Sequence, residues 1–151
     1  MQIKRTLSAF GIGLFMATGM VAAPVVLTPS LAYADFAEGS AFRSIIQKQI
    51  SAFQSGDAKQ AFSYATPTLQ KRFQTPEIFI HMVKNGYKPV YRPKNVTFGQ
   101  SRKTPHGPMQ EVYVTDQEGQ NWLAVYSFEK QPDGSWRISG CYLKKDEGIS
   151  A

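Results

Sequence analysis

The sequence has one cysteine, Cys141, and two histidines, His81 and His106. An internal disulfide is therefore impossible, and the fold depends on its apolar core. One cysteine and two distant histidines do not provide the spacing of a zinc site, and no glycine-rich loop that would cradle a phosphate is present. We therefore expect a domain that binds no metal and uses no cofactor.

Basic residues exceed acidic ones, but they do not form a long run. The formal net charge is +6 at pH 7, and pairs such as Arg102-Lys103 and Lys144-Lys145 are scattered along the chain. Nucleic-acid binding requires basic residues that are gathered on one face. We therefore expect that the protein does not bind nucleic acid.

The first 34 residues have the pattern of a secretory signal. Lys4 and Arg5 precede a largely apolar run over residues 7–27, and Ala32-Tyr33-Ala34 provides the small residues at which a signal peptidase cleaves. Cleavage after Ala34 would leave 117 of the 151 residues and, because Lys4 and Arg5 are lost, a formal charge of +4 instead of +6. The residue directly after that position is Asp35 and not a cysteine, which excludes the usual bacterial lipid attachment.

An uncleaved membrane anchor is the alternative, because the apolar run reaches the lower limit of length for a segment that spans a bilayer. Cleavage is favoured by the residues that interrupt this run, which are Gly11, Gly13, Gly19, Pro24 and Pro29. We expect a periplasmic or secreted protein that contacts the membrane only transiently, through its signal. Residues 35–40 would form a short arm, residues 41–143 a single domain and residues 144–151 a flexible tail.

Three helices are predicted in the first half of the mature chain. The second follows a cap at Asp57 and ends at Pro67, and the third begins at Thr75-Pro76-Glu77 and ends at Asn85-Gly86. The first ends at Gly56 and has apolar residues at helical spacing, namely Phe42, Ile45, Ile46, Ile50 and Phe53.

Four strands are predicted after Gly86, where the apolar pattern changes to period two: residues 96–100, 109–115, 121–130 and 135–143. Turns at Glu118-Gly119 and Pro132-Asp133-Gly134 join the last three strands as hairpins. Helices followed by an antiparallel meander indicate an α+β fold, in which the helices cover one face of a curved sheet.

Turn lengths predict which residues share a face of this sheet. A two-residue turn at Glu118-Gly119 would pair Glu111 with Tyr126, and a one-residue error would exchange the two faces. One face, rich in aromatic rings, would carry Met109, Glu111, Tyr113, Trp122, Tyr126, Phe128, Trp136, Ile138 and Tyr142. The other face would carry Val112, Val114, Leu123, Val125, Cys141 and Leu143. Because this second face is also apolar, we expect a second copy to cover it in a homodimer.

Five clusters of residues together have a familiar pattern: residues 60–65 with Pro67, residues 86–93, Phe98-Gly99, residues 133–138 and residues 140–143. This pattern resembles the bacterial family called domain of unknown function 4864, over roughly residues 41–143. The family is similar to the nuclear-transport-factor-2-like superfamily, in which a curved sheet wraps helices into a cone. The resemblance implies that Trp136 and Ile138 face the helices, so that the aromatic face would be concave and the other face convex and available for pairing. It implies no particular activity, because that superfamily includes isomerases, dehydratases, hydrolases and non-catalytic modules.

Glu111 and Tyr126 form the candidate catalytic pair. Burial among aromatic rings favours the neutral form of a carboxyl, which suits proton transfer. The alternative is that Glu111 reaches water at the sheet edge. His81, on the third predicted helix, is a weaker candidate for moving protons, and its alternative is a surface histidine.

A small apolar ligand would contact an aromatic cavity lined by Tyr87, Tyr113, Trp122 and Tyr126, with Arg92 available for an anionic group. The alternative is that these rings fill the core and Arg92 lies on the surface. Cys141 is expected to be a small buried hydrophobe.

The sequence thus predicts an exported binding or accessory module. A cofactor-free enzyme that uses Glu111 with Tyr126, and a structural protein-interaction module, are the alternatives.

Overall fold

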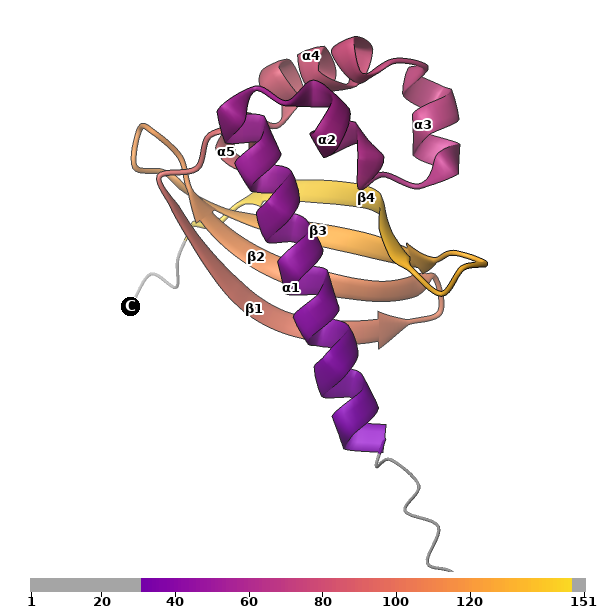
Figure 1. Cartoon of the computed structure of the whole chain (residues 1–151). Helices are drawn as coiled ribbons and strands as arrows, with labels where there is room; N and C mark the ends of the chain where they lie inside the picture. The colour runs from indigo at the N-terminus through magenta and orange to yellow at the C-terminus, as the bar shows by residue number, and fades with distance from the viewer. Residues whose placement is uncertain (1–30, 148–151) are drawn as a thin grey trace, which may run out of the picture.

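The computed structural model describes residues 31–147, in which a long helix crosses the hollow of a curved sheet and shorter helices gather at one end of it (Figure 1). The helices are α1 (Leu31–Ser55), α2 (Ala58–Ser63), α3 (Pro67–Phe73), α4 (Pro76–Gly86) and α5 (Lys88–Tyr91). The strands are β1 (Asn95–Thr104), β2 (Gly107–Thr115), β3 (Asn121–Lys130) and β4 (Trp136–Lys145). They form an antiparallel sheet in chain order, and the predicted α+β fold is confirmed.

The boundaries at both ends differ from the predicted ones. Residues 35–40, expected as an arm, belong to α1, where the carboxylates of Asp35 and Glu38 lie beside the Lys103 ammonium of β1. Strand β4 continues to Lys145, into the segment expected as a tail. The predicted signal over residues 1–34 lies almost wholly outside the described residues and stays a prediction.

Side-chain caps start three of the short helices. Asp57 Oδ1 accepts from the Gln60 amide at 2.9 Å at the start of α2, and Thr75 Oγ1 accepts from the Ile78 amide at 3.2 Å at the start of α4. Both starts were predicted. Helix α3 was not, because Pro67 was taken as the end of the preceding helix. It is instead the first residue of α3, behind the cap Thr66. Helix α5 was also missed.

The predicted register between β2 and β3 is wrong by one residue. Val112 pairs with Ala124 and Val114 with Trp122, so that Gln110, and not Glu111, is opposite Tyr126. The cause is Asp116, whose Oδ1 accepts from the amides of Glu118 at 3.1 Å and Gln120 at 2.8 Å. This carboxylate lengthens the turn to three residues and ends it at Gly119, which has a positive φ of 85°.

A second irregularity changes which residues of β4 lie on each face of the sheet. The turn at Pro132-Asp133-Gly134 is as predicted, and Phe128 pairs with Ile138. A bulge then places Ser139 between two paired positions, so that Tyr126 pairs with Cys141 and Ala124 with Leu143. Cys141 and Leu143 therefore share a face with Ile138, where Gly140 and Tyr142 were expected.

The corrected register sorts the sheet into an inner face under the helices and an outer face. Val112 and Ala124 are fully buried on the inner face, whereas Tyr113 is 40% exposed and Tyr142 65% exposed on the outer face. The prediction that Glu111, Tyr113 and Tyr142 face the helices is therefore wrong. Inner-face residues include Val112, Val114, Trp122, Tyr126, Phe128, Trp136, Ile138, Cys141 and Leu143. As the resemblance implied, Trp136 and Ile138 are among them.

Helix α1 packs its apolar side into the hollow of the sheet. The ring of Phe42 stacks on Phe128 with centroids 4.3 Å apart and meets Trp136 edge-on at 5.1 Å. The segment between α2 and α3 is tied to the start of β4, because the Thr66 amide donates to the Ile138 carbonyl at 2.9 Å and the Ile138 amide to the Tyr64 carbonyl at 2.8 Å. These bonds fix α3 next to β4.

Candidate ligand-binding cavity

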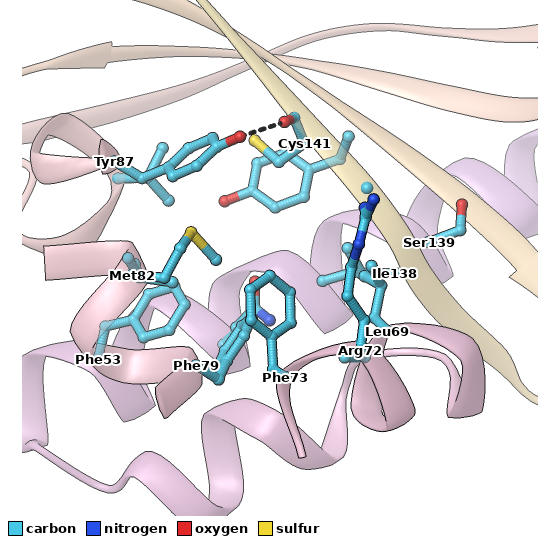
Figure 2. A pocket seen from close by; sticks show the side chains of 16 residues that line it. Phe53, Leu69, Arg72, Phe73, Phe79, Met82, Tyr87, Ile138, Ser139 and Cys141 are labelled. Atoms are coloured by element: carbon cyan, nitrogen blue, oxygen red, sulfur yellow. Dashed lines mark hydrogen bonds between the residues drawn. The ribbon is translucent and has the colours of Figure 1, made fainter. Parts of the chain in front are cut away.

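A cavity of about 230 Å³ opens between α3, α4 and β4 (Figure 2). Sites for drug-sized ligands typically have about 300–1,000 Å³. The cavity therefore suits a smaller molecule, of the size of one substituted aromatic ring. Its lining is mainly apolar and comes from α1 (Gln49, Phe53), Ala65, α3 (Leu69, Arg72, Phe73), α4 (Phe79, Met82, Val83), the α5 region (Tyr87, Val90) and the sheet (Tyr126, Ile138, Ser139, Gly140, Cys141).

Exposure divides this lining into a buried floor and a rim. The floor consists of the buried members, among them Phe53, Phe79, Tyr126 and Ile138. The rim consists of half-buried members with the exposed Arg72 beside them, and Leu69, Phe73, Met82, Tyr87 and Ser139–Cys141 belong to it. Since the rim reaches solvent, a ligand can enter without the core opening.

The phenol hydroxyl of Tyr126 is a polar atom at this floor without a hydrogen-bond partner. Tyr126 is 1% exposed, and it is the fully buried side chain of greatest volume in the described chain. The thiol of its strand partner Cys141 is the hydrogen-bonding group beside this hydroxyl, and a thiol bonds only weakly. Because a poorly paired buried hydroxyl costs up to about 1–3 kcal/mol, a stronger partner on a bound ligand would stabilise this atom.

Burial keeps the tyrosine and cysteine side chains of the lining neutral. It raises the pKa of the Tyr126 phenol well above its ordinary value, and it raises the pKa of the Cys141 thiol to about 12. Tyr87 donates from its hydroxyl to the Cys141 carbonyl at 3.1 Å, and burial raises its pKa as well (Figure 2). At neutral pH these three side chains therefore offer hydroxyl and thiol groups, and no anion.

Arg72 is the charged residue among those that line the cavity. It lies in the last turn of α3, and its side chain extends from that helix towards β4 (Figure 2). Within residues 31–147 its guanidinium has neither an ion pair nor a side-chain hydrogen bond. No acidic side chain lines the cavity in the described part of the chain, so the rim has an unbalanced positive charge.

The predicted catalytic pair is not assembled. Glu111 lies on the outer face, where Oε1 is 2.6 Å from an Arg102 guanidinium nitrogen, while Tyr126 lies on the inner face. His81 is exposed on α4, within 3.3 Å of the Asn85 side-chain amide, and it is not among the residues that line the cavity. The enzyme alternative that needs Glu111 beside Tyr126 is therefore contradicted by the register.

The predicted ligand-binding residues are only partly brought together. Tyr87 and Tyr126 line the cavity, whereas Tyr113 lies on the outer face. Trp122 is on the inner face but donates from Nε1 to Asp116 Oδ2 at 2.7 Å, away from the lining. Arg92 lies over the ring of Tyr91, with 5.6 Å between the guanidinium carbon and the ring centroid.

The residues predicted for a homodimer face do not form one surface. Leu123 and Val125 pair with outer-face positions, but four others lie under the helices, namely Val112, Val114, Cys141 and Leu143. That residue set cannot pair two copies, and a homodimer stays a prediction.

Several residues of the cavity were missed by the sequence reasoning. Leu69, Arg72 and Phe73 come from α3, which was not predicted. A signal for them existed, because Thr66-Pro67 has the same cap-and-proline form as the recognised Thr75-Pro76. Phe53 and Phe79 were predicted as helix core, and their position at a cavity depends on packing that a local pattern does not contain.

The sequence model of one family, described as domain of unknown function (DUF4864), matches residues 35–151. The chain belongs to this family. The DUF4864 match covers 117 of the 151 residues and contains the whole of the cavity lining.

No curated protein and no solved structure matches the chain. The relation of the DUF4864 domain to the nuclear-transport-factor-2-like superfamily therefore stays a prediction. Within residues 31–147, no helix combines the length and the apolar character needed to cross a membrane. The same residues contain no group of three or more His, Cys, Asp or Glu side chains that could hold a metal ion.

Proposed function

We propose that this domain is a binding module for a small, mainly apolar molecule, which occupies the cavity between α3, α4 and β4. The observation that carries the proposal is the half-open cavity of about 230 Å³, with aromatic walls and a rim in solvent. Apolar walls that water can reach are unfavourable, because apolar surface is more stable when it is removed from water. A mainly apolar ligand would cover these walls.

The arrangement of the walls supports binding more than catalysis. The phenylalanine rings of Phe53, Phe73 and Phe79 come from three different helices and lie within 6.2 Å of one another, centroid to centroid, in the pairs Phe53–Phe79 and Phe73–Phe79. The tyrosine and cysteine side chains of the lining are neutral, and no acid lines the cavity among the described residues. Such a site can enclose a ligand, and it has no group poised as a general base.

We also propose that the domain acts after export. The family match starts at residue 35, which is the residue that cleavage after Ala34 would expose as the new N-terminus. This agreement supports a signal that is removed and a family domain that remains.

Binding is tested with p-cresol, a small neutral phenol, added to the protein expressed from the full chain and followed by two-dimensional NMR. We expect saturable shifts of the amides of residues 138–141 and of α4, and no shifts at Tyr113 or Leu123 on the outer face.

A matched pair of variants locates the binding. Leu69→Trp enlarges a half-buried rim residue and is expected to weaken p-cresol binding at least tenfold, while Leu123→Trp, at a half-buried residue outside the cavity, leaves it unchanged. Equal affinity of the two variants, or shifts confined to the outer face, would exclude the proposal.

A further inference from the structure

Two polar groups at opposite levels of the cavity lack a strong partner among the described residues, and their positions define a ligand chemistry. One is the Tyr126 hydroxyl at the buried floor. The other is the Arg72 guanidinium, which lines the cavity beside the exposed rim. The surfaces between them are mainly apolar. A ligand that satisfies all three parts has a charged end, an apolar body and a neutral polar end.

Resting on the proposed function, we propose that the ligand is a small organic monocarboxylate: its carboxylate pairs with Arg72 at the rim, and a hydroxyl or carbonyl at its other end hydrogen-bonds to Tyr126.

The charged end is assigned to an anion because the cavity lining has one cation and, in the described chain, no acid. A guanidinium presents two parallel N–H groups that match the two oxygens of a carboxylate. A doubly charged phosphate normally needs several donors. Besides Arg72 the rim offers the Ser139 hydroxyl, since the Tyr87 hydroxyl already donates to the Cys141 carbonyl. A single carboxylate therefore fits this rim better than a phosphate.

The inner end is assigned to a neutral group because the floor is dry and apolar. A charge there would lose its hydration with no opposite charge to replace it, whereas a hydroxyl or carbonyl needs only one hydrogen bond. The Tyr126 hydroxyl can donate or accept such a bond. Ligands that carry this inner group are expected to bind more tightly than ligands without it, because the latter leave the Tyr126 hydroxyl without a strong partner.

The ordinary explanation of Arg72 is a surface residue that favours the C-terminal end of α3 through the helix dipole. Lys71 lies in the same last turn and is also exposed, but it does not line the cavity. It therefore provides a matched control. A dipole effect or a general attraction to anions is expected to involve both residues. A site that binds a carboxylate is expected to involve Arg72 alone.

The test compares four probes by isothermal titration calorimetry on the protein expressed from the full chain: p-cresol, benzoate, 4-hydroxybenzoate and its neutral analogue 4-hydroxybenzamide. We expect 4-hydroxybenzoate to bind about tenfold more tightly than 4-hydroxybenzamide, since charge-assisted hydrogen bonds are roughly twice as strong as neutral ones. Arg72→Met is expected to bring the ratio of these two affinities down to about one, while Lys71→Met preserves the preference.

Tyr126→Phe tests the floor. It is expected to reduce the ratio of the affinities for 4-hydroxybenzoate and benzoate from roughly three- to tenfold to about one. Equal binding of acid and amide, or equal effects of Arg72→Met and Lys71→Met, overturns the carboxylate assignment while p-cresol binding still supports the proposed function. Failure of p-cresol and of all the other probes to bind overturns both.

Discussion

At the scale of single residues, the paired positions Tyr126 and Cys141 show how burial changes chemistry. Both titrate normally in water, and in the folded protein burial raises the pKa of each. A thiol with a pKa of about 12 is almost wholly protonated at neutral pH, so it behaves as a small apolar group. The same residue was expected on the outside of the sheet, and its chemistry follows from its corrected position inside.

Alkaline pH is predicted to destabilise the protein through these groups. Because the pKa of Cys141 is raised by burial from 9.0 to about 12, the folded state holds its proton more tightly than the unfolded state. This contribution is complete below pH 9 and is lost as the pH rises towards 12, and Tyr126 acts in the same direction. Urea unfolding between pH 8 and 11 should therefore show a falling free energy of unfolding.

Cys141→Val keeps a side chain of similar size and removes the titration, so its free energy of unfolding should fall less steeply with pH. Ser139→Ala changes a neighbouring rim residue without a titratable group and should match the wild-type slope. A Cys141→Val variant with the full wild-type slope would contradict the assignment.

At the scale of elements, a single carboxylate decides which face of the sheet is inside. Asp116 accepts three hydrogen bonds, from the Trp122 ring and from the amides of Glu118 and Gln120. The bond from Trp122 and those from the turn lower the pKa of Asp116, so the carboxylate stays ionised in its turn. The turn that it forms has three residues, and this length determines on which face of the sheet each side chain of β2 lies.

The register is tested by two neighbouring truncations. Val112→Ala is expected to lower the free energy of unfolding by about 2–4 kcal/mol, because it leaves a cavity beneath the helices. Tyr113→Ala, at the next residue, removes a larger but partly exposed side chain and should cost about 1 kcal/mol or less. Denaturant unfolding measures both, and the reverse order of costs would show that the faces are exchanged.

Helix α3 is predicted to be needed for binding as well as for stability. Thr66→Ala removes its cap and should cost about 1–2 kcal/mol, and affinity for p-cresol should fall with it because α3 provides Leu69 and Phe73. Asp57→Ala removes the equivalent cap of α2, whose residues do not line the cavity. This control should lose stability and keep its affinity; a loss of affinity in both variants would show a global effect.

Sequence patterns were sufficient to predict most of the helices and strands, but they were insufficient to predict on which face of the sheet each residue lies. The helical spacing from Phe42 to Phe53 and the cap at Thr75 predicted α1 and α4, because those signals are local. The three-residue turn at Asp116 and the bulge at Ser139 are not local in this sense, since each depends on bonds that form only in the folded hairpin. Because the candidate site is built from residues of one sheet face, both errors passed directly into its predicted composition.

At the scale of the whole molecule, the family domain and the predicted signal divide the chain at one position. The domain match begins at residue 35, and the predicted cleavage lies between Ala34 and Asp35. The structure places residues 31–34 within α1, so cleavage would shorten this helix at its start and leave its ion pairs with Lys103 in place. Processing and folding are therefore compatible.

The proposed export is tested by measuring the mass and the N-terminal sequence of the protein recovered from cells that express the full chain. We expect an N-terminus at Asp35 in the periplasmic or extracellular fraction. Intact chain held in the membrane fraction would support the alternative of an uncleaved anchor.

The contacts of Phe42 also determine when this core can be completed. Its ring packs on Phe128 of β3 and Trp136 of β4, so the first helix to leave a ribosome or a translocation channel meets its partners only when the last strand has followed. The sheet pairs strands that are neighbours in the chain, and such local contacts form quickly. The contacts of α1 are long-range and require the last strand. A core ordered in this way is completed only after the last strand has been made.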